Sequence, residues 1–266
     1  MYLSRFRFNT ARPGARRLLS SPQSLHAAVM SSFPHLLPTG TGTGSGAADG
    51  SRVLWRLDRN AAAEVLLYVV SPDRPDMTHL VEQAGWPAAA TAQAPGWQSR
   101  PYTPFLDRLT EGSVWAFRLT ANPVHQIRRK EGEPTKRTAH LTPIHQMDWL
   151  LNPQRQERGG FLICEKPADK GLLPGGTTHH NRPYHGDRYE LMVRDQRNLS
   201  FPKQGPDNTS TRHRVTLVTV TYDGQLTVTD PDRLSATLTQ GLGKAKAYGC
   251  GLMTLVPLPH DGKVSR

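Results

Sequence analysis

The alternation of hydrophobic and polar residues predicts a strand-helix-strand-strand-helix-strand order in the N-terminal half of the chain. Residues 2–8 alternate as a strand. Leu25, Val29 and Phe33 recur at helical spacing after Ser21-Pro22, a pair that suits the start of a helix. Strands over 53–57 and 64–70, a short helix over 77–83, a loop over 84–103 and a strand over 113–120 follow.

The C-terminal half repeats this order less regularly. A helix over 144–156 is interrupted by Pro153, and strands are expected over 161–164, 188–194, 214–222 and 225–229. Asp223-Gly224 between the last two favours a hairpin turn. Asp230-Pro231 suits the start of a helix that ends at Gly241, before a final strand over 252–258. The pattern predicts an α+β fold of two tandem ferredoxin-like (RRM-like) βαββαβ domains, over 1–120 and 121–260.

The charge of the chain favours a polyanionic partner. Its 33 Lys and Arg residues outnumber 22 Asp and Glu residues, which gives a formal net charge of +11. The longest apolar run, over 65–70, is too short to span a bilayer, and the N-terminus has no secretory signal. Two cysteines, Cys164 and Cys250, make no disulfide framework. We therefore expect a cytoplasmic protein that binds nucleic acid and no membrane.

A glycine-rich segment near the C-terminus carries the most distinctive local pattern. In GLGKAKAYGCG, Gly241 and Gly243 precede Lys244 and Lys246, and two more glycines follow. Glycine lets a backbone approach another closely, and lysines between glycines can reach phosphates. Packing of the last strand against its helix would require glycines equally, so both interpretations stay open.

The same segment resembles the C-terminal signature of CRISPR-associated RNA-processing endonucleases. Together with MYLSRFRFN, SLHAAVMSSFP and FRLTANPV, it is similar to the CasE family of type I-E systems. The resemblance implies tandem ferredoxin-like domains, binding of the stem-loop in CRISPR repeat RNA, and one cut at the base of the stem. It implies attack by a ribose 2′-OH without metal or cofactor, leaving a 2′,3′-cyclic phosphate and a 5′-OH. The mature guide RNA would stay bound, and the protein, a monomer when free, would join the Cascade complex.

The resemblance places the catalytic histidine at His26. Imidazole is suited to moving protons near neutral pH, although a lone helical histidine is more often structural. The family often has Tyr three residues earlier, where this chain has Gln23. Gln23 lies one helical turn from His26 and can orient a phosphate, but it cannot titrate. A non-catalytic RNA-binding scaffold subunit is therefore the alternative function.

Basic clusters supply candidate RNA contacts on two further segments. Loops rich in arginine and lysine suit the phosphates and 2′-hydroxyls of an A-form stem, unless they are merely solvated. The candidates are Arg128, Arg129, Lys136 and Arg137 in one cluster, and Arg194, Arg197, Lys203, Arg212 and Arg214 in the other.

The glycines over 39–46 lack the Gly-Lys-Ser/Thr of a phosphate loop, and the histidines over 179–185 lack the spacing of a metal site. We expect no metal, and the absence of a zinc or helix-turn-helix pattern argues against a DNA-binding protein.

Overall fold

The chain forms two compact units. The computed structural model describes residues 1–33, 52–61, 63–127, 135–167, 188–203 and 213–258. The N-terminal unit holds Met1–Arg108, Leu199–Thr216 and Thr239–Leu252. The C-terminal unit holds Leu109–Asn198, Leu217–Leu238 and Met253–Arg266. This division lies a dozen residues before the predicted boundary at 120, and it gives the glycine-rich segment to the N-terminal unit.

The N-terminal unit is built on a four-stranded antiparallel sheet. Its strands are β1 (Tyr2–Phe8), β2 (Leu54–Ala61), β3 (Glu64–Ser71) and β4 (Trp97–Pro101), in the order β2-β3-β1-β4. The first strand lies between the third and the fourth, which is the order of a ferredoxin-like sheet. The sheet therefore has β2 at one edge and β4 at the other.

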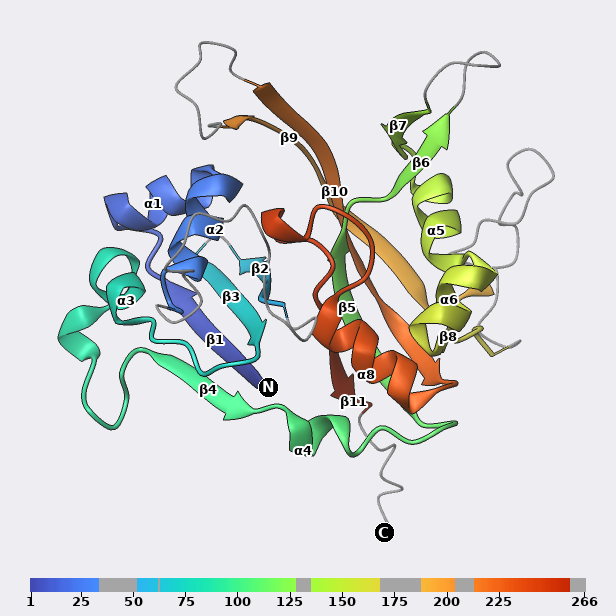
Figure 1. The fold of residues 1–266 in the computed structure, drawn as a ribbon, viewed down its shortest axis with the longest axis horizontal. Helices are drawn as coiled ribbons and strands as arrows, with labels where there is room; N and C mark the ends of the chain where they lie inside the picture. The colour runs from blue at the N-terminus through green and yellow to red at the C-terminus, as the bar shows by residue number, and fades with distance from the viewer. Residues whose placement is uncertain (34–51, 62, 128–134, 168–187, 204–212, 259–266) are drawn as a thin grey trace, which may run out of the picture. The chain divides into compact units, whose positions relative to one another are not determined.

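Three helices cover one face of this sheet (Figure 1). They are α1 (Pro13–Ser20), α2 (Pro22–Met30) and α3 (Thr78–Ala84). Alternate residues of the strands, among them Phe6, Phe8 and Leu67, pack with the helices in one core. The predicted start of α2 is confirmed, since Pro22 is its first residue and Ser21 Oγ accepts a hydrogen bond from the Ser24 amide at 3.2 Å.

Two parts of the N-terminal unit differ from the sequence prediction. Helix α1 was not predicted, because arginines separate its buried residues, Ala15 and Leu18. The segment read as a loop over 84–103 contains the 3₁₀ turn η2 (Pro87–Ala89) and strand β4, followed by α4 (Thr103–Leu106). Strand β4 is polar and partly exposed at a sheet edge, so it carries little hydrophobic alternation.

The C-terminal unit repeats the same topology. Strands β5 (Val114–Ala121), β8 (Phe161–Ile163), β10 (His213–Val228) and β11 (Met253–Pro257) form a sheet in the order β11-β5-β10-β8. Helices α5 (Pro143–Leu151) and α6 (Pro153–Gly159) precede β8, and α8 (Pro231–Gln240) precedes β11. The predicted tandem ferredoxin-like fold is confirmed. The strand expected to close the N-terminal domain is instead β5, which pairs with β10 and β11.

Additional strands enlarge the C-terminal unit. The strand pair β6 (Val124–Ile127) and β7 (Lys136–Ala139) follows β5. Strand β9 (Leu191–Lys203) pairs with β10, and both strands continue into the N-terminal unit. Within the described residues, no helix is both long and apolar enough to cross a bilayer.

The hairpin turn predicted at Asp223-Gly224 is wrong. Both residues lie inside the continuous strand β10, where Asp223 pairs with Arg118 of β5 and Gly224 with Phe117. A Cβ on Gly224 would lie 2.3 Å from the Glu190 carbonyl oxygen, which accepts a hydrogen bond from the Gln225 amide at 2.9 Å. The glycine is needed for this close approach of two backbones and not for a turn.

Candidate active site

His26 lies on α2 of the N-terminal unit with its imidazole half-buried. The indole Nε1–H of Trp55 donates a hydrogen bond to His26 Nδ1 over 3.4 Å. Burial lowers the pKa of His26 below its ordinary value, so the ring is neutral at pH 7. Gln23 lies one turn earlier on the same helix, also half-buried, and its predicted role stays a prediction.

Strand β2 presents Trp55 to the helix that carries His26. The Trp55 side chain belongs to the core of the N-terminal unit and is only 2% exposed. A buried indole usually finds an acceptor for its N–H, and here that acceptor is a half-buried imidazole. Hydrophobic alternation identified Trp55 as a core residue, but nothing in the sequence indicated its contact with His26.

The glycine-rich segment packs against β2 and α2. It forms a 3₁₀ turn, η5 (Lys246–Tyr248), which contacts both elements. Gly249 has φ +81°, and a Cβ there would lie 2.6 Å from Cζ3 of Trp55. Gly241, with φ +80°, similarly approaches Leu54 of β2. Close packing therefore explains these two glycines, and it places the lysine-bearing turn beside the helix of His26.

Cations gather at this turn. Lys244 is exposed, whereas Lys246 is half-buried and its Nζ donates to the carbonyl oxygen of Gln240, the last residue of α8, at 2.7 Å. Burial lowers the pKa of Lys246, and the charges of Arg52 and Lys244 lower it further. Lys246 thus caps a helix end, a structural role that the sequence did not predict. Arg52, which the sequence interpretation missed, joins Lys244 as an exposed cation.

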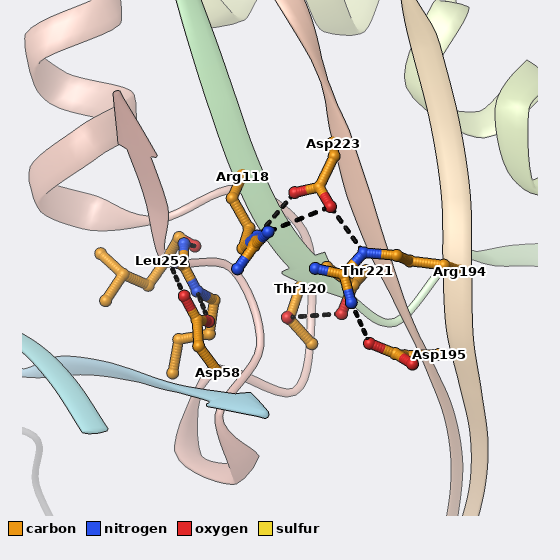
Figure 2. A network of polar contacts seen from close by, with 9 residues as sticks. Asp58, Arg118, Thr120, Arg194, Asp195, Thr221, Asp223 and Leu252 are labelled. Atoms are coloured by element: carbon orange, nitrogen blue, oxygen red, sulfur yellow. Dashed lines mark hydrogen bonds and ion pairs between the residues drawn. The ribbon is translucent and has the colours of Figure 1, made fainter. Parts of the chain in front are cut away.

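A buried ion pair fixes the end of the glycine-rich segment to β2. Arg56 donates to both carboxylate oxygens of Asp58, at 2.6 and 2.9 Å, and to the carbonyl oxygen of Leu252 at 3.1 Å. Figure 2 labels Asp58 and Leu252, the two residues that Arg56 joins. Arg56 is 1% exposed and Asp58 7%, so the pair is almost dehydrated. The two charges stabilise the fold by binding one another, and they are not available to a ligand.

The arginines of the second basic cluster differ in how far acidic side chains neutralise them. Arg194 on β9 shares Asp223 with Arg118, each with a contact of 2.6 Å, and also pairs with Asp195 (Figure 2). Burial alone would raise the pKa of Asp223, but the two guanidinium groups outweigh it and hold that pKa below its ordinary value. Arg194 is therefore largely neutralised within the fold.

Arg197 on β9 and Arg214 on β10 are exposed, and Arg214 donates to Ser200 Oγ. These arginines lie on strands and not on the loop that the sequence predicted. Phe201, near the end of β9, contacts Tyr248 of η5 edge-on with ring centroids 4.9 Å apart. The end of this strand therefore packs against the glycine-rich segment inside the N-terminal unit.

The remaining predicted residues lie elsewhere. Lys136 and Arg137 are exposed on β7. Outside the described residues lie Arg128, Arg129, Arg212, the side chain of Lys203, the glycines over 39–46 and the histidines over 179–185. In the part of the chain that the structure describes, no three His, Cys, Asp or Glu side chains are placed to hold a metal ion.

Comparison with known proteins agrees with this geometry. The family described as CRISPR associated protein matches residues 1–257. The chain is 26% identical over 257 residues to the CRISPR-associated endoribonuclease Cse3 of Thermus thermophilus, covering 97% of this chain and 100% of that protein. It is 26% identical over 212 residues to the CRISPR system Cascade subunit CasE of Escherichia coli, covering 77% and 89%.

A solved structure extends the likeness to the fold. The structure of Thermus thermophilus Cse3 bound to an RNA that represents a pre-cleavage complex matches with a TM-score of 0.65 and 25% identity, over 96% of this chain and 98% of that one. The family match spans both units and every segment on which the resemblance to CasE rests. The chain therefore belongs to the CRISPR-associated protein family, as that resemblance predicted.

Proposed function

We propose that the protein is an endoribonuclease that binds the stem-loop of CRISPR repeat RNA and cuts it once at the base of the stem. The observation that carries this proposal is the placement of half-buried His26 on a helix that packs against the glycine-rich segment, in which Lys244 is exposed. The named activity of the Thermus thermophilus relative and its RNA-bound structure support it. The reaction would take place in the cytoplasm, and the protein would then act as a Cascade subunit, like its Escherichia coli relative.

The chemistry suits an imidazole and needs no external nucleophile. The 2′-oxygen attacks the adjacent phosphorus, the bond from phosphorus to the 5′-oxygen breaks, and the proton lost by the 2′-hydroxyl is balanced by the one that the 5′-oxygen gains. We assign to His26 the assistance that this reaction needs at the breaking bond, where its imidazole acts on the departing 5′-oxygen. Lys244 and Arg52 hold the phosphate near it by charge, and Gln23 can add a hydrogen bond.

Replacing the 2′-OH next to the scissile phosphate with hydrogen should abolish cleavage, because the deoxy RNA lacks the nucleophile. Cleavage of the unmodified RNA should continue in EDTA. The measurement is a single-turnover gel assay with purified protein and a stem-loop of the host's CRISPR repeat. A deoxy substitution elsewhere in the stem is the matched control and should be cut normally. Cutting of the test RNA, or a requirement for Mg²⁺, would instead indicate a hydrolytic nuclease.

Loss of Lys244 should harm the chemical step as well as binding. A phosphate that is held less firmly loses the in-line geometry that positioning provides. Arg214, exposed on β10, should contribute to binding alone. Each substitution to alanine should reduce the salt dependence of binding by roughly one phosphate contact.

Single-turnover rates at saturating protein separate the two contributions. Lys244→Ala should cut more slowly than wild type, whereas Arg214→Ala should cut bound RNA at nearly the normal rate. If both variants cut at the wild-type rate, the glycine-rich segment has only a structural role.

A further inference from the structure

Trp55 connects the glycine-rich segment with His26. One edge of its indole, at Nε1, donates to His26 Nδ1 over 3.4 Å. The six-membered ring of the same indole, at Cζ3, lies so close to Gly249 that a Cβ there would be 2.6 Å away. The side chain is 2% exposed and packed in the core. The tryptophan therefore has little freedom to turn, and the direction of its N–H is set by the fold.

A hydrogen bond to one imidazole nitrogen determines the state of the other. A neutral imidazole carries one proton, and the nitrogen that accepts a hydrogen bond must be the one without it. Because Trp55 has only a donor to offer, Nδ1 of His26 is the acceptor. The proton of the neutral ring then lies on Nε2, the nitrogen that this contact leaves free for RNA.

We propose that Trp55 is a positioning residue for RNA cleavage, whose indole N–H keeps His26 Nδ1 unprotonated so that Nε2–H faces the RNA. This inference rests on the proposed function of His26. In that state Nε2 cannot accept the 2′-hydroxyl proton, so solvent water takes that proton and water also supplies the one that the 5′-oxygen gains. The Nε2–H donates a hydrogen bond to the negative charge that develops on the phosphate and the departing 5′-oxygen. The tautomer thus places His26 on the leaving-group side of the reaction.

Gly249 contributes indirectly to the orientation of His26, because it leaves room for the indole ring of Trp55. Any side chain at this position would meet the indole ring and push it, and with it the N–H that faces His26. Glycine at 249 therefore serves the orientation of Trp55, in addition to any contact that the segment makes with RNA. Gly249→Ala should accordingly resemble the loss of the indole N–H.

The first experiment reads the tautomer directly in the full-length wild-type protein. The ring nitrogens of ¹⁵N-labelled histidine are observed by NMR above the pKa of His26, and its signals are assigned by their loss in His26→Ala. We expect a pyridine-type Nδ1 and a pyrrole-type Nε2. A protonated Nδ1 in the wild-type protein would overturn the inference, and this result does not depend on the folding of any variant.

The second experiment tests whether the contact matters for cleavage. Trp55→Phe keeps an aromatic ring and removes the donor. We expect single-turnover cleavage to fall by about 3- to 10-fold, the worth of one neutral hydrogen bond, with RNA affinity unchanged. Gly249→Ala should slow cleavage in the same direction.

A double-mutant cycle separates a positioning role from general damage. In a His26→Ala background, Trp55→Phe should have no further effect on the rate, because the group it positions is gone. Equal losses with and without His26 would show that Trp55 acts only through the fold. If His26→Ala itself cuts at the wild-type rate, the proposed function fails. If only Trp55→Phe does so, the inference alone fails.

Discussion

His26→Ala should slow cleavage by about 10²–10⁴-fold, the loss expected when a group that assists proton transfer or stabilises developing negative charge is removed. The side chain is half-buried on α2 and hydrogen-bonded to Trp55, and burial lowers its pKa so that the neutral form prevails at pH 7. Affinity for the stem-loop should change little, because binding is distributed over many phosphate contacts. The measurement is single-turnover cleavage at saturating protein, with affinity obtained separately by titration.

His145 provides a matched control for this substitution. It is an exposed histidine on α5 of the C-terminal unit, so His145→Ala should cut RNA at the wild-type rate. Cleavage by His26→Ala at the wild-type rate would move the reaction centre elsewhere. Complete absence of cleavage by the wild-type protein, with tight binding retained, would favour the non-catalytic scaffold subunit.

Asp58→Ala should destabilise the N-terminal unit by about 3–5 kcal/mol, the cost of leaving one partner of a buried ion pair uncompensated. Arg56 is 1% exposed, and it would lose both of its contacts to the carboxylate. It also holds the Leu252 carbonyl oxygen, so the loosened arginine should disturb the end of the glycine-rich segment. Chemical unfolding followed by tryptophan fluorescence would measure the loss.

Two comparisons test the cause of this effect. Arg188 and Glu165 form an ion pair at 2.7 Å whose side chains are more than half exposed, so Glu165→Ala should leave the free energy of unfolding nearly unchanged. Replacing Arg56 and Asp58 together with Met and Leu should recover much of the stability, because no buried charge is then left unpaired. If Asp58→Ala were as harmless as Glu165→Ala, the pair would not be the support for β2 that its burial indicates.

Local patterns were sufficient to predict most elements and to identify the family. Three local patterns depend only on neighbouring residues and are therefore visible in sequence: the alternation over 2–8, the nearly continuous apolar run over 64–70 and the Ser21-Pro22 start of α2. The prediction of local structure failed where contacts with residues remote in sequence determine the backbone conformation. Asp223-Gly224 fits a turn by composition, yet Arg118 and Arg194 hold Asp223 within a continuous strand.

The candidate site shows the same division between sequence and tertiary structure. By itself the sequence determined the tandem ferredoxin-like fold, the excess of basic charge and, through the resemblance, the choice of His26. Only the tertiary structure decided which charges are free, because Arg194 and Lys246 meet partners that no local pattern specifies. It also decided that Trp55 lies between His26 and Gly249. These contacts join residues far apart in the chain. A buried polar group without a hydrogen-bond partner costs free energy, so its partner is a group that the tertiary fold places beside it, and no local sequence pattern specifies that group.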